Sequence, residues 1–192
     1  MIGRKTVAGG PLVAFLLLLI LMTTGFACEG EEPEVVDEAS LLALNSYVRE
    51  MCLTLQDGTL RADLKGWVRE YYEDDLPLYY DEERREWLGE HLGRLEEVYT
   101  SHRRAASFPS DEEIASWSVY LVQGETEWLL EGTEALAALG RLDDLYGEMT
   151  AVASMIIDND GELDLSQSER VLALLESLDS EIEAVRSFFF RG

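Results

Sequence analysis

The chain has 192 residues, 47% of them hydrophobic, and a formal net charge of −24. So negative a chain repels nucleic acid and anionic lipid headgroups, which disfavours a role in binding either one directly. Its only cysteines, Cys28 and Cys52, are too few for a zinc cluster or a disulfide framework, and their spacing excludes a CxxC redox pair.

The first 28 residues have the three parts of an export signal. Arg4 and Lys5 precede an unbroken apolar run over residues 12–22, and a stretch of mostly small residues then ends at Cys28. The apolar run is shorter than the roughly 20 residues that span a bilayer as a helix. We therefore expect residues 1–27 to be a signal peptide.

The segment before the cysteine, Thr24-Gly25-Phe26-Ala27-Cys28, resembles the lipobox of bacterial lipoproteins. The resemblance implies lipidation of Cys28 and a protein anchored to a membrane of the cell envelope, facing the periplasm or the exterior. Gly25 and Phe26 depart from the usual pattern, which has a leucine-like residue and then a small one at these positions. Gly25-Phe26-Ala27 also fits the small-x-small site of ordinary signal peptidase, which would give a secreted protein, and an uncleaved anchor is the third alternative.

All acidic residues follow Cys28, whereas Arg4 and Lys5 precede it, so the chain from Cys28 onward has a net charge of −26. Residues 28–37 are acidic and show no periodicity, which predicts a tether before a single domain at 38–192. The acidity would attract cations or a basic partner. The even spread of the acids favours the other interpretation, a solvated surface suited to high salt.

From residue 38 the apolar spacing is that of amphipathic helices. The first helix carries Leu41, Leu44, Val48, Met51 and Leu55 and should end at Asp57-Gly58. A second is expected from residue 59 to about 73, where residues 74–77 (DDLP) stop it, because the residue before a proline disfavours helical geometry. A third runs from residue 81 to 102.

Ser110 and Glu113 predict a capping box at the start of a helix whose apolar spacing continues to residue 156. We expect a break near Gly132-Thr133 or Gly140, the alternative being one bent helix. After a loop at 158–165 a last helix reaches Phe189. No stretch was recognised as a half-buried strand, so the predicted fold is all-α, an up-and-down bundle of five or six helices.

Aromatic residues cluster around the turn between the second and third predicted helices. They predict a groove for a ligand or partner, although core packing is the commoner reason for such a cluster. The residues concerned are Trp67, Tyr71, Tyr72, Tyr79, Tyr80 and Trp87.

Residues 158–169 (DNDGELDLSQSE) place oxygen-bearing side chains at alternate positions and a glutamate at the twelfth. This loop resembles the calcium loop of an EF-hand, which implies a calcium site. Leu163 stands at the sixth position, where the family has glycine, and Gly161 stands at the fourth. The alternative is a polar turn with a second capping box formed by Ser166 and Glu169. The ligands implied are Asp158, Asp160, Glu162, Asp164 and Glu169.

Motifs of catalysis are absent from the sequence. His91 and His102 stand in no Glu-x-x-His pair, and neither HExxH nor GxSxG occurs. The sequence therefore predicts a non-catalytic binding or structural module of the bacterial envelope, lipid-anchored or secreted, whose partner no motif identifies. A calcium-binding module and an enzyme with scattered catalytic groups are the alternatives.

Overall fold

A computed structural model describes residues 36–73, 82–123 and 125–190. The predicted signal peptide, Cys28 and most of the predicted tether lie outside these residues. In the described part six α-helices, one π-helical turn and one two-stranded sheet occur, which confirms the all-α class. The elements are α2 (Glu38–Leu55), α3 (Gly58–Glu73), α4 (Glu82–Val98), η1 (Tyr99–Arg103), α5 (Asp111–Ala115), β1 (Ser118–Gln123), β2 (Thr126–Glu131), α6 (Gly132–Asp158) and α7 (Leu165–Phe189).

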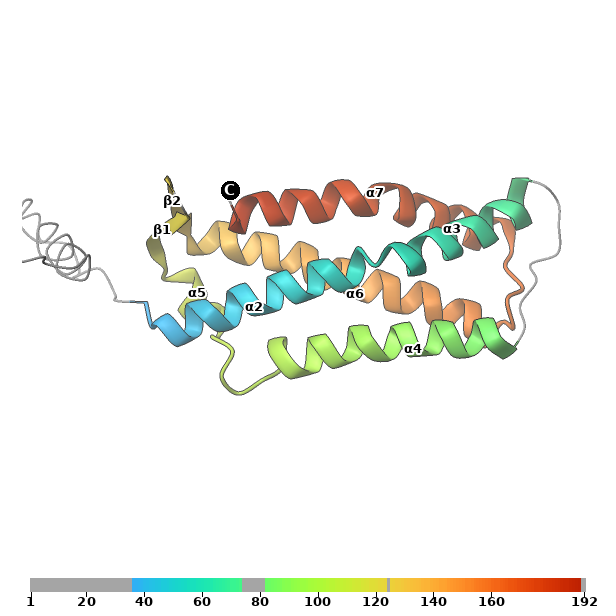
Figure 1. The fold of residues 1–192 in the computed structure, drawn as a ribbon, viewed down its shortest axis with the longest axis horizontal. Coiled ribbons are helices and arrows are strands. Elements are labelled where there is room, and N and C mark those ends of the chain that lie inside the picture. Colours follow the sequence, from blue (N-terminus) through green and yellow to red (C-terminus); the bar gives the residue numbers. More distant parts are fainter. Residues whose placement is uncertain (1–35, 74–81, 124, 191–192) are drawn as a thin grey trace, which may run out of the picture. The chain divides into compact units, whose positions relative to one another are not determined.

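The long helices form four rods that run alternately up and down (Figure 1). Helices α2 and α3 follow one another end to end as the first rod, and α4, α6 and α7 are the other three. Helix α5 and the β1–β2 hairpin connect the second rod to the third, at the end where α2 begins and α7 finishes. The predicted up-and-down bundle is therefore the observed architecture, with its first rod broken.

The apolar stripe of α2 lies in the core. Leu44, Val48, Met51 and Leu55 are fully buried, as their three- and four-residue spacing predicts. Asp37 caps this helix, because its carboxylate accepts a hydrogen bond from the Ser40 N–H at 3.3 Å. The bundle thus includes at least one residue of the segment expected to be a tether.

The first rod breaks at Gln56 and Asp57, at the position that Asp57-Gly58 predicts. Cys52, one turn before the break, is 1% exposed and packs in the core as a small apolar residue. Burial raises the pKa of its thiol to about 12. This thiol is therefore protonated at neutral pH.

Residues 117–131 correct the prediction of a continuous helix. Ser110 caps α5 as expected, its hydroxyl accepting the Glu113 N–H at 3.1 Å, but α5 ends at Ala115 and an antiparallel hairpin follows. Within the hairpin, Leu121 pairs with Trp128 on the inner face, and Tyr120 and Val122 are 67% and 70% exposed. The alternation of these aromatic and β-branched residues has the period of a strand, which outweighs the weaker helical spacing.

Gly132 fixes the junction between the hairpin and α6. Its N–H donates to the carbonyl of Trp117 at 2.8 Å, and a Cβ on this residue would lie 1.8 Å from the carbonyl oxygen of Ile114. Only glycine fits so close to another backbone. The predicted break near Gly132-Thr133 is therefore the start of α6, since the preceding helix already ends at Ala115, and Gly140 lies inside α6 without a break.

Candidate functional site

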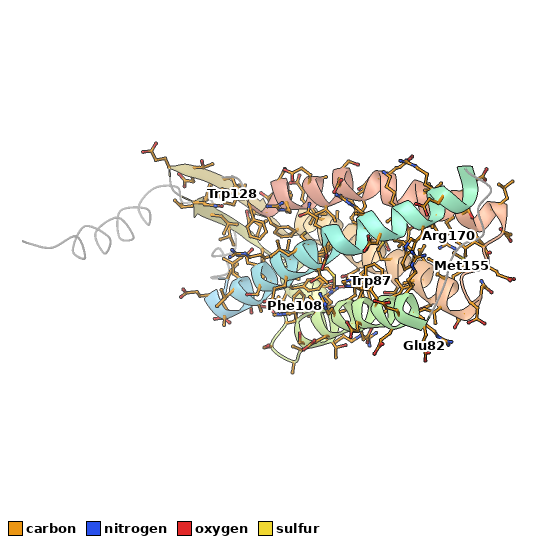
Figure 2. All side chains as sticks on the ribbon, turned by 45° about the vertical axis from the view of Figure 1, so that its right-hand side comes forward. Glu82, Trp87, Phe108, Trp128, Met155 and Arg170 are labelled. Carbon is orange, nitrogen blue, oxygen red and sulfur yellow. The ribbon has the colours of Figure 1, made fainter. Side chains whose placement is uncertain are left out.

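A pocket of about 380 Å³ lies between α3 and α4. The ring centroids of Trp67 and Trp87 are 5.5 Å apart, in an edge-to-face arrangement with an interplanar angle of 61°. Figure 2 shows Trp87 on the side of α4 turned toward α3. We call this site the tryptophan pocket, and its described lining is Asp63, Trp67, Glu83, Arg84 and Trp87.

Helical spacing brings a carboxylate to each tryptophan. Asp63 and Trp67 lie four residues apart on α3, and Glu83 and Trp87 lie four apart on α4, so each pair shares one helix face. Both indoles are half-buried and pack against the core, while both carboxylates are exposed. The pocket thus has an aromatic wall held by the bundle and an acidic rim.

The pocket already contains a cation of the chain itself. The guanidinium carbon of Arg84 lies 4.6 Å from the centroid of the Trp67 ring. The face of an indole attracts a cation in this position by about 0.5–1 kcal/mol at an exposed site. The structure therefore shows that the Trp67 face accepts a guanidinium.

His91 backs the aromatic wall, one turn after Trp87 on α4. Its ring centroid is 4.5 Å from that of Trp87 at an interplanar angle of 86°, and the residue is 5% exposed. Burial lowers the pKa of the imidazole, so His91 is neutral at pH 7. Its Nε2 has no hydrogen-bond partner among the described residues. The wall behind Trp87 therefore adds no positive charge to the pocket.

Of the six residues predicted for a groove, the structure brings Trp67 and Trp87 together. Tyr71 and Tyr72 belong to α3, but their side chains are outside the described part of the chain, as are Tyr79 and Tyr80 entirely. Two of the predicted residues therefore line the pocket, while its acidic and basic lining was missed. The four-residue spacing of Asp63 to Trp67 was the available signal.

The predicted calcium loop connects α6 to α7. Asp158 ends α6, and Asp160 and Gly161, with φ of 50° and 81°, make the left-handed turn. Leu163, at the position where an EF-hand has its glycine, is 3% exposed and packs in the core. The turn thus occurs two residues earlier than in an EF-hand, and the sixth position serves packing.

The start of α7 uses one of the predicted calcium ligands as a cap. The Asp164 carboxylate accepts the Gln167 N–H, and the Gln167 side-chain oxygen accepts the Asp164 N–H, both at 2.8 Å. The capping box predicted at Ser166 and Glu169 is therefore wrong. Asp164 is the residue directly before the first helical residue of α7, so its carboxylate, not the Ser166 hydroxyl, accepts from the free backbone N–H groups of the first turn.

The other acidic residues of the loop are not gathered into one site. The Asp160 carboxylate lies 3.7 Å from the Arg85 guanidinium. Over residues 36–73, 82–123 and 125–190, no three or more His, Cys, Asp or Glu side chains form a group that could hold a metal ion. The five predicted ligands thus extend from the end of α6 into the first turns of α7, and no three of them form such a group in the described arrangement.

A polar network that sequence reasoning missed surrounds η1. The buried Tyr47 hydroxyl donates to Asp143 at 2.5 Å, and Arg103 donates to Asp143 at 3.1 Å and to Asp111 at 3.0 Å. Burial, followed by the hydrogen bond to the Asp143 carboxylate, raises the pKa of Tyr47. These bonds join α2, η1, α5 and α6. The hydrogen-bonded partners are 40 or more positions apart, except for Arg103 and Asp111, so no sequence spacing could reveal the network.

Aromatic rings enclose the same network. The Tyr47 and Phe108 centroids are 5.7 Å apart in an edge-to-face contact, and the Arg103 guanidinium lies 5.0 Å from the Phe108 ring. Although π-helical turns often mark functional sites, Arg103 of this one bonds to α5 and α6, and the His102 Nε2 lies 3.0 Å from the Glu50 carboxylate of α2. We therefore assign the η1 network to the joining of the rods.

In the described residues, no helix combines the length and the apolar character needed to cross a bilayer. No protein-family model, no curated protein and no solved structure matches the chain. The chemistry of the tryptophan pocket is therefore the basis on which a function can be proposed.

Proposed function

We propose that the chain is a lipid-anchored binding module of a bacterial cell envelope and that the tryptophan pocket receives a cationic group of a protein partner. The anchor rests on the export signal and on Ala27-Cys28, which resemble those of bacterial lipoproteins. More than one acyl chain on the modified N-terminus would anchor it stably and hold the bundle at the membrane surface through the acidic segment that follows.

The observation that carries the binding role is the position of Arg84. Its guanidinium lies over the Trp67 ring at 4.6 Å, in a pocket whose rim includes two carboxylates. An arginine of a partner needs the same two features, an aromatic face and a carboxylate within reach. The pocket thus presents to a partner the environment that it already provides to its own arginine.

Long-range electrostatics favour the same class of partner. A charge of −26 on the chain from Cys28 onward attracts basic surfaces and speeds their association, and added salt weakens the attraction. A binding role of this kind requires no catalytic residue.

Titration with acetylated, amidated arginine tests the pocket, with the citrulline analogue as the neutral ligand of the same shape. We expect arginine to shift the indole N–H resonances of Trp67 and Trp87, and citrulline to bind at least about fivefold more weakly because it lacks the charge.

Two double variants with the same charge change provide the matched comparison. Asp63→Asn with Glu83→Gln should weaken arginine binding several-fold, whereas Asp144→Asn with Glu148→Gln, exposed on α6, should leave it within twofold. Equal binding of arginine and citrulline, or equal losses in the two double variants, would remove the basis for a cation site.

The anchor is tested separately by cell fractionation. Cys28→Ser should move the protein from the membrane to the soluble fraction, and Cys52→Ala, which removes the other thiol, should not. Retention of the Cys28→Ser protein in the membrane would contradict lipidation and indicate an uncleaved anchor.

A further inference from the structure

A second pocket, of about 340 Å³, lies between α2, the tip of β1 and the C-terminal end of α7. It is assembled from three segments of the chain, the first and last of which are more than 130 positions apart, which is why its members escaped sequence analysis. We call it the hairpin groove, and its described lining is Arg49, Leu53, Gln123, Arg186 and Phe190.

The charged part of the groove is positive, in contrast to the chain as a whole. Arg49 is exposed on α2, and no salt bridge or side-chain hydrogen bond joins it to another described residue. The Arg186 guanidinium donates to the Gln56 side-chain oxygen at 3.4 Å and is 4.0 Å from the Glu183 carboxylate. Each guanidinium has five N–H donors, so both keep donors for a ligand.

The rest of the described lining is apolar or neutral. Leu53, near the C-terminal end of α2, is 58% exposed, and Phe190 is half-buried with its ring against the core. Gln123, at the end of β1, contributes an uncharged amide. Two guanidiniums therefore stand beside an uncovered apolar surface.

An anionic group attached to an apolar chain satisfies both parts. A cation would be repelled by the arginines, and a neutral apolar molecule would leave their hydrogen-bonding capacity unused. A carboxylate pairs with guanidinium in a bidentate fashion, and an attached hydrocarbon chain would cover Leu53 and Phe190. The volume lies within the range of about 300–1,000 Å³ found for small-molecule sites.

We infer that the hairpin groove binds a monocarboxylate with an apolar chain, of the size of a medium-chain fatty acid. Arg49 and Arg186 hold the carboxylate, and Leu53 and Phe190 contact the chain. The inference is independent of the role proposed for the tryptophan pocket, which uses other residues on other helices.

Octanoate is the probe, and the experiment is done on the purified folded chain at about 0.15 M salt, where charges beyond about 8 Å are screened. We expect octanoate to shift the backbone amide resonances of Leu53, Gln123 and Arg186 in a saturable titration. Octan-1-ol and acetate, which each lack one half of the ligand, should bind at least about tenfold more weakly.

The matched variants remove the same charge at two places. Arg49→Gln with Arg186→Gln should weaken octanoate binding at least about tenfold. Arg141→Gln with Arg170→Gln should leave it within twofold, since both arginines are exposed outside the groove and Arg170 lies at the opposite end of α7 (Figure 2).

Three results would overturn the inference. Equal binding of octanoate and acetate would indicate a nonspecific anion effect, and equal binding of octanoate and octan-1-ol would show that the arginines are not used. Equal losses in the two double variants, each with the thermal stability of the wild type, would show that net charge and not the groove governs binding.

Discussion

The tryptophan pocket and the hairpin groove have similar volumes, about 380 and 340 Å³, but opposite linings. In the first, two carboxylates and a cation surround two indoles. In the second, two guanidiniums flank an exposed leucine and a phenylalanine. The charge of each lining is therefore set by its local composition and not by the net charge of the chain.

The two sites also differ in how the chain assembles them. The tryptophan pocket uses residues four apart on two consecutive helices, so the pocket forms once α3 and α4 pack side by side. The hairpin groove needs α2, β1 and α7 in their correct relative positions. A change that disturbs only the hairpin should thus affect one site and spare the other.

Gly132→Ala should produce the largest difference between ligand binding at the hairpin groove and at the tryptophan pocket. The new Cβ would lie 1.8 Å from the Ile114 carbonyl oxygen, so the hairpin junction must shift, at a cost of about 1–3 kcal/mol in the free energy of unfolding. Octanoate binding to the groove should be lost, while arginine binding to the tryptophan pocket should remain. Chemical denaturation and the two titrations measure these effects.

Gly140→Ala is the control for that change. Nothing lies within 4 Å of a Cβ at this position in α6, so the variant should be more stable than the wild type by up to about 1 kcal/mol. If Gly132→Ala were as stable as Gly140→Ala, Gly132 could not lie as close to the Ile114 carbonyl as the structure shows.

His91→Leu tests the neutral wall behind the tryptophan pocket. Burial holds the pKa of His91 below its usual value near 6.5, outweighing the opposite influence of Asp57. The pKa of His91 is thus lower in the folded chain than in the unfolded chain. At a pH between these two values the unfolded chain binds a proton that the folded chain does not, so His91 lowers the free energy of unfolding as the pH falls through about 6.5. The wild type should therefore lose more unfolding free energy than His91→Leu between pH 7.5 and 5.5. Parallel pH profiles would contradict a buried neutral imidazole.

The smallest expected effect is that of substitutions in residues 158–169 on the response of the melting temperature to calcium. Because Asp164 caps α7 and Asp160 pairs with Arg85, we expect calcium and magnesium to raise the melting temperature by similar amounts at constant ionic strength. Asp158→Asn with Glu169→Gln should respond like the wild type. A calcium-specific increase that this double variant lacks would establish the EF-hand-like site after all.

The helical rods were predictable because their apolar residues follow one period over long stretches, as Leu44, Val48 and Leu55 do in α2. The hairpin was missed because Leu121 and Trp128 also fit a helical spacing, and the strands are only six residues each. The signal that could have revealed it was the alternation on either side of Gly124, the residue that a two-residue hairpin turn favours.

The two pockets differ in predictability for the same reason. Trp67 and Trp87 were found because aromatic residues near one turn must meet if the flanking helices are antiparallel. Arg49 and Arg186 could not be paired from sequence, since their proximity depends on the packing of the first rod against the last. Tertiary contacts of this kind leave no local pattern.

The most direct test of the tryptophan pocket is the affinity of arginine for Arg84→Gln, measured against Arg85→Gln. Both variants remove one positive charge from α4, but only Arg84 lies over the Trp67 ring. Arg84→Gln frees that ring, so arginine should bind about two- to fivefold more tightly than to Arg85→Gln, the equivalent of one cation–π contact. Equal affinities for the two variants would contradict the pocket as a site for a partner's cation.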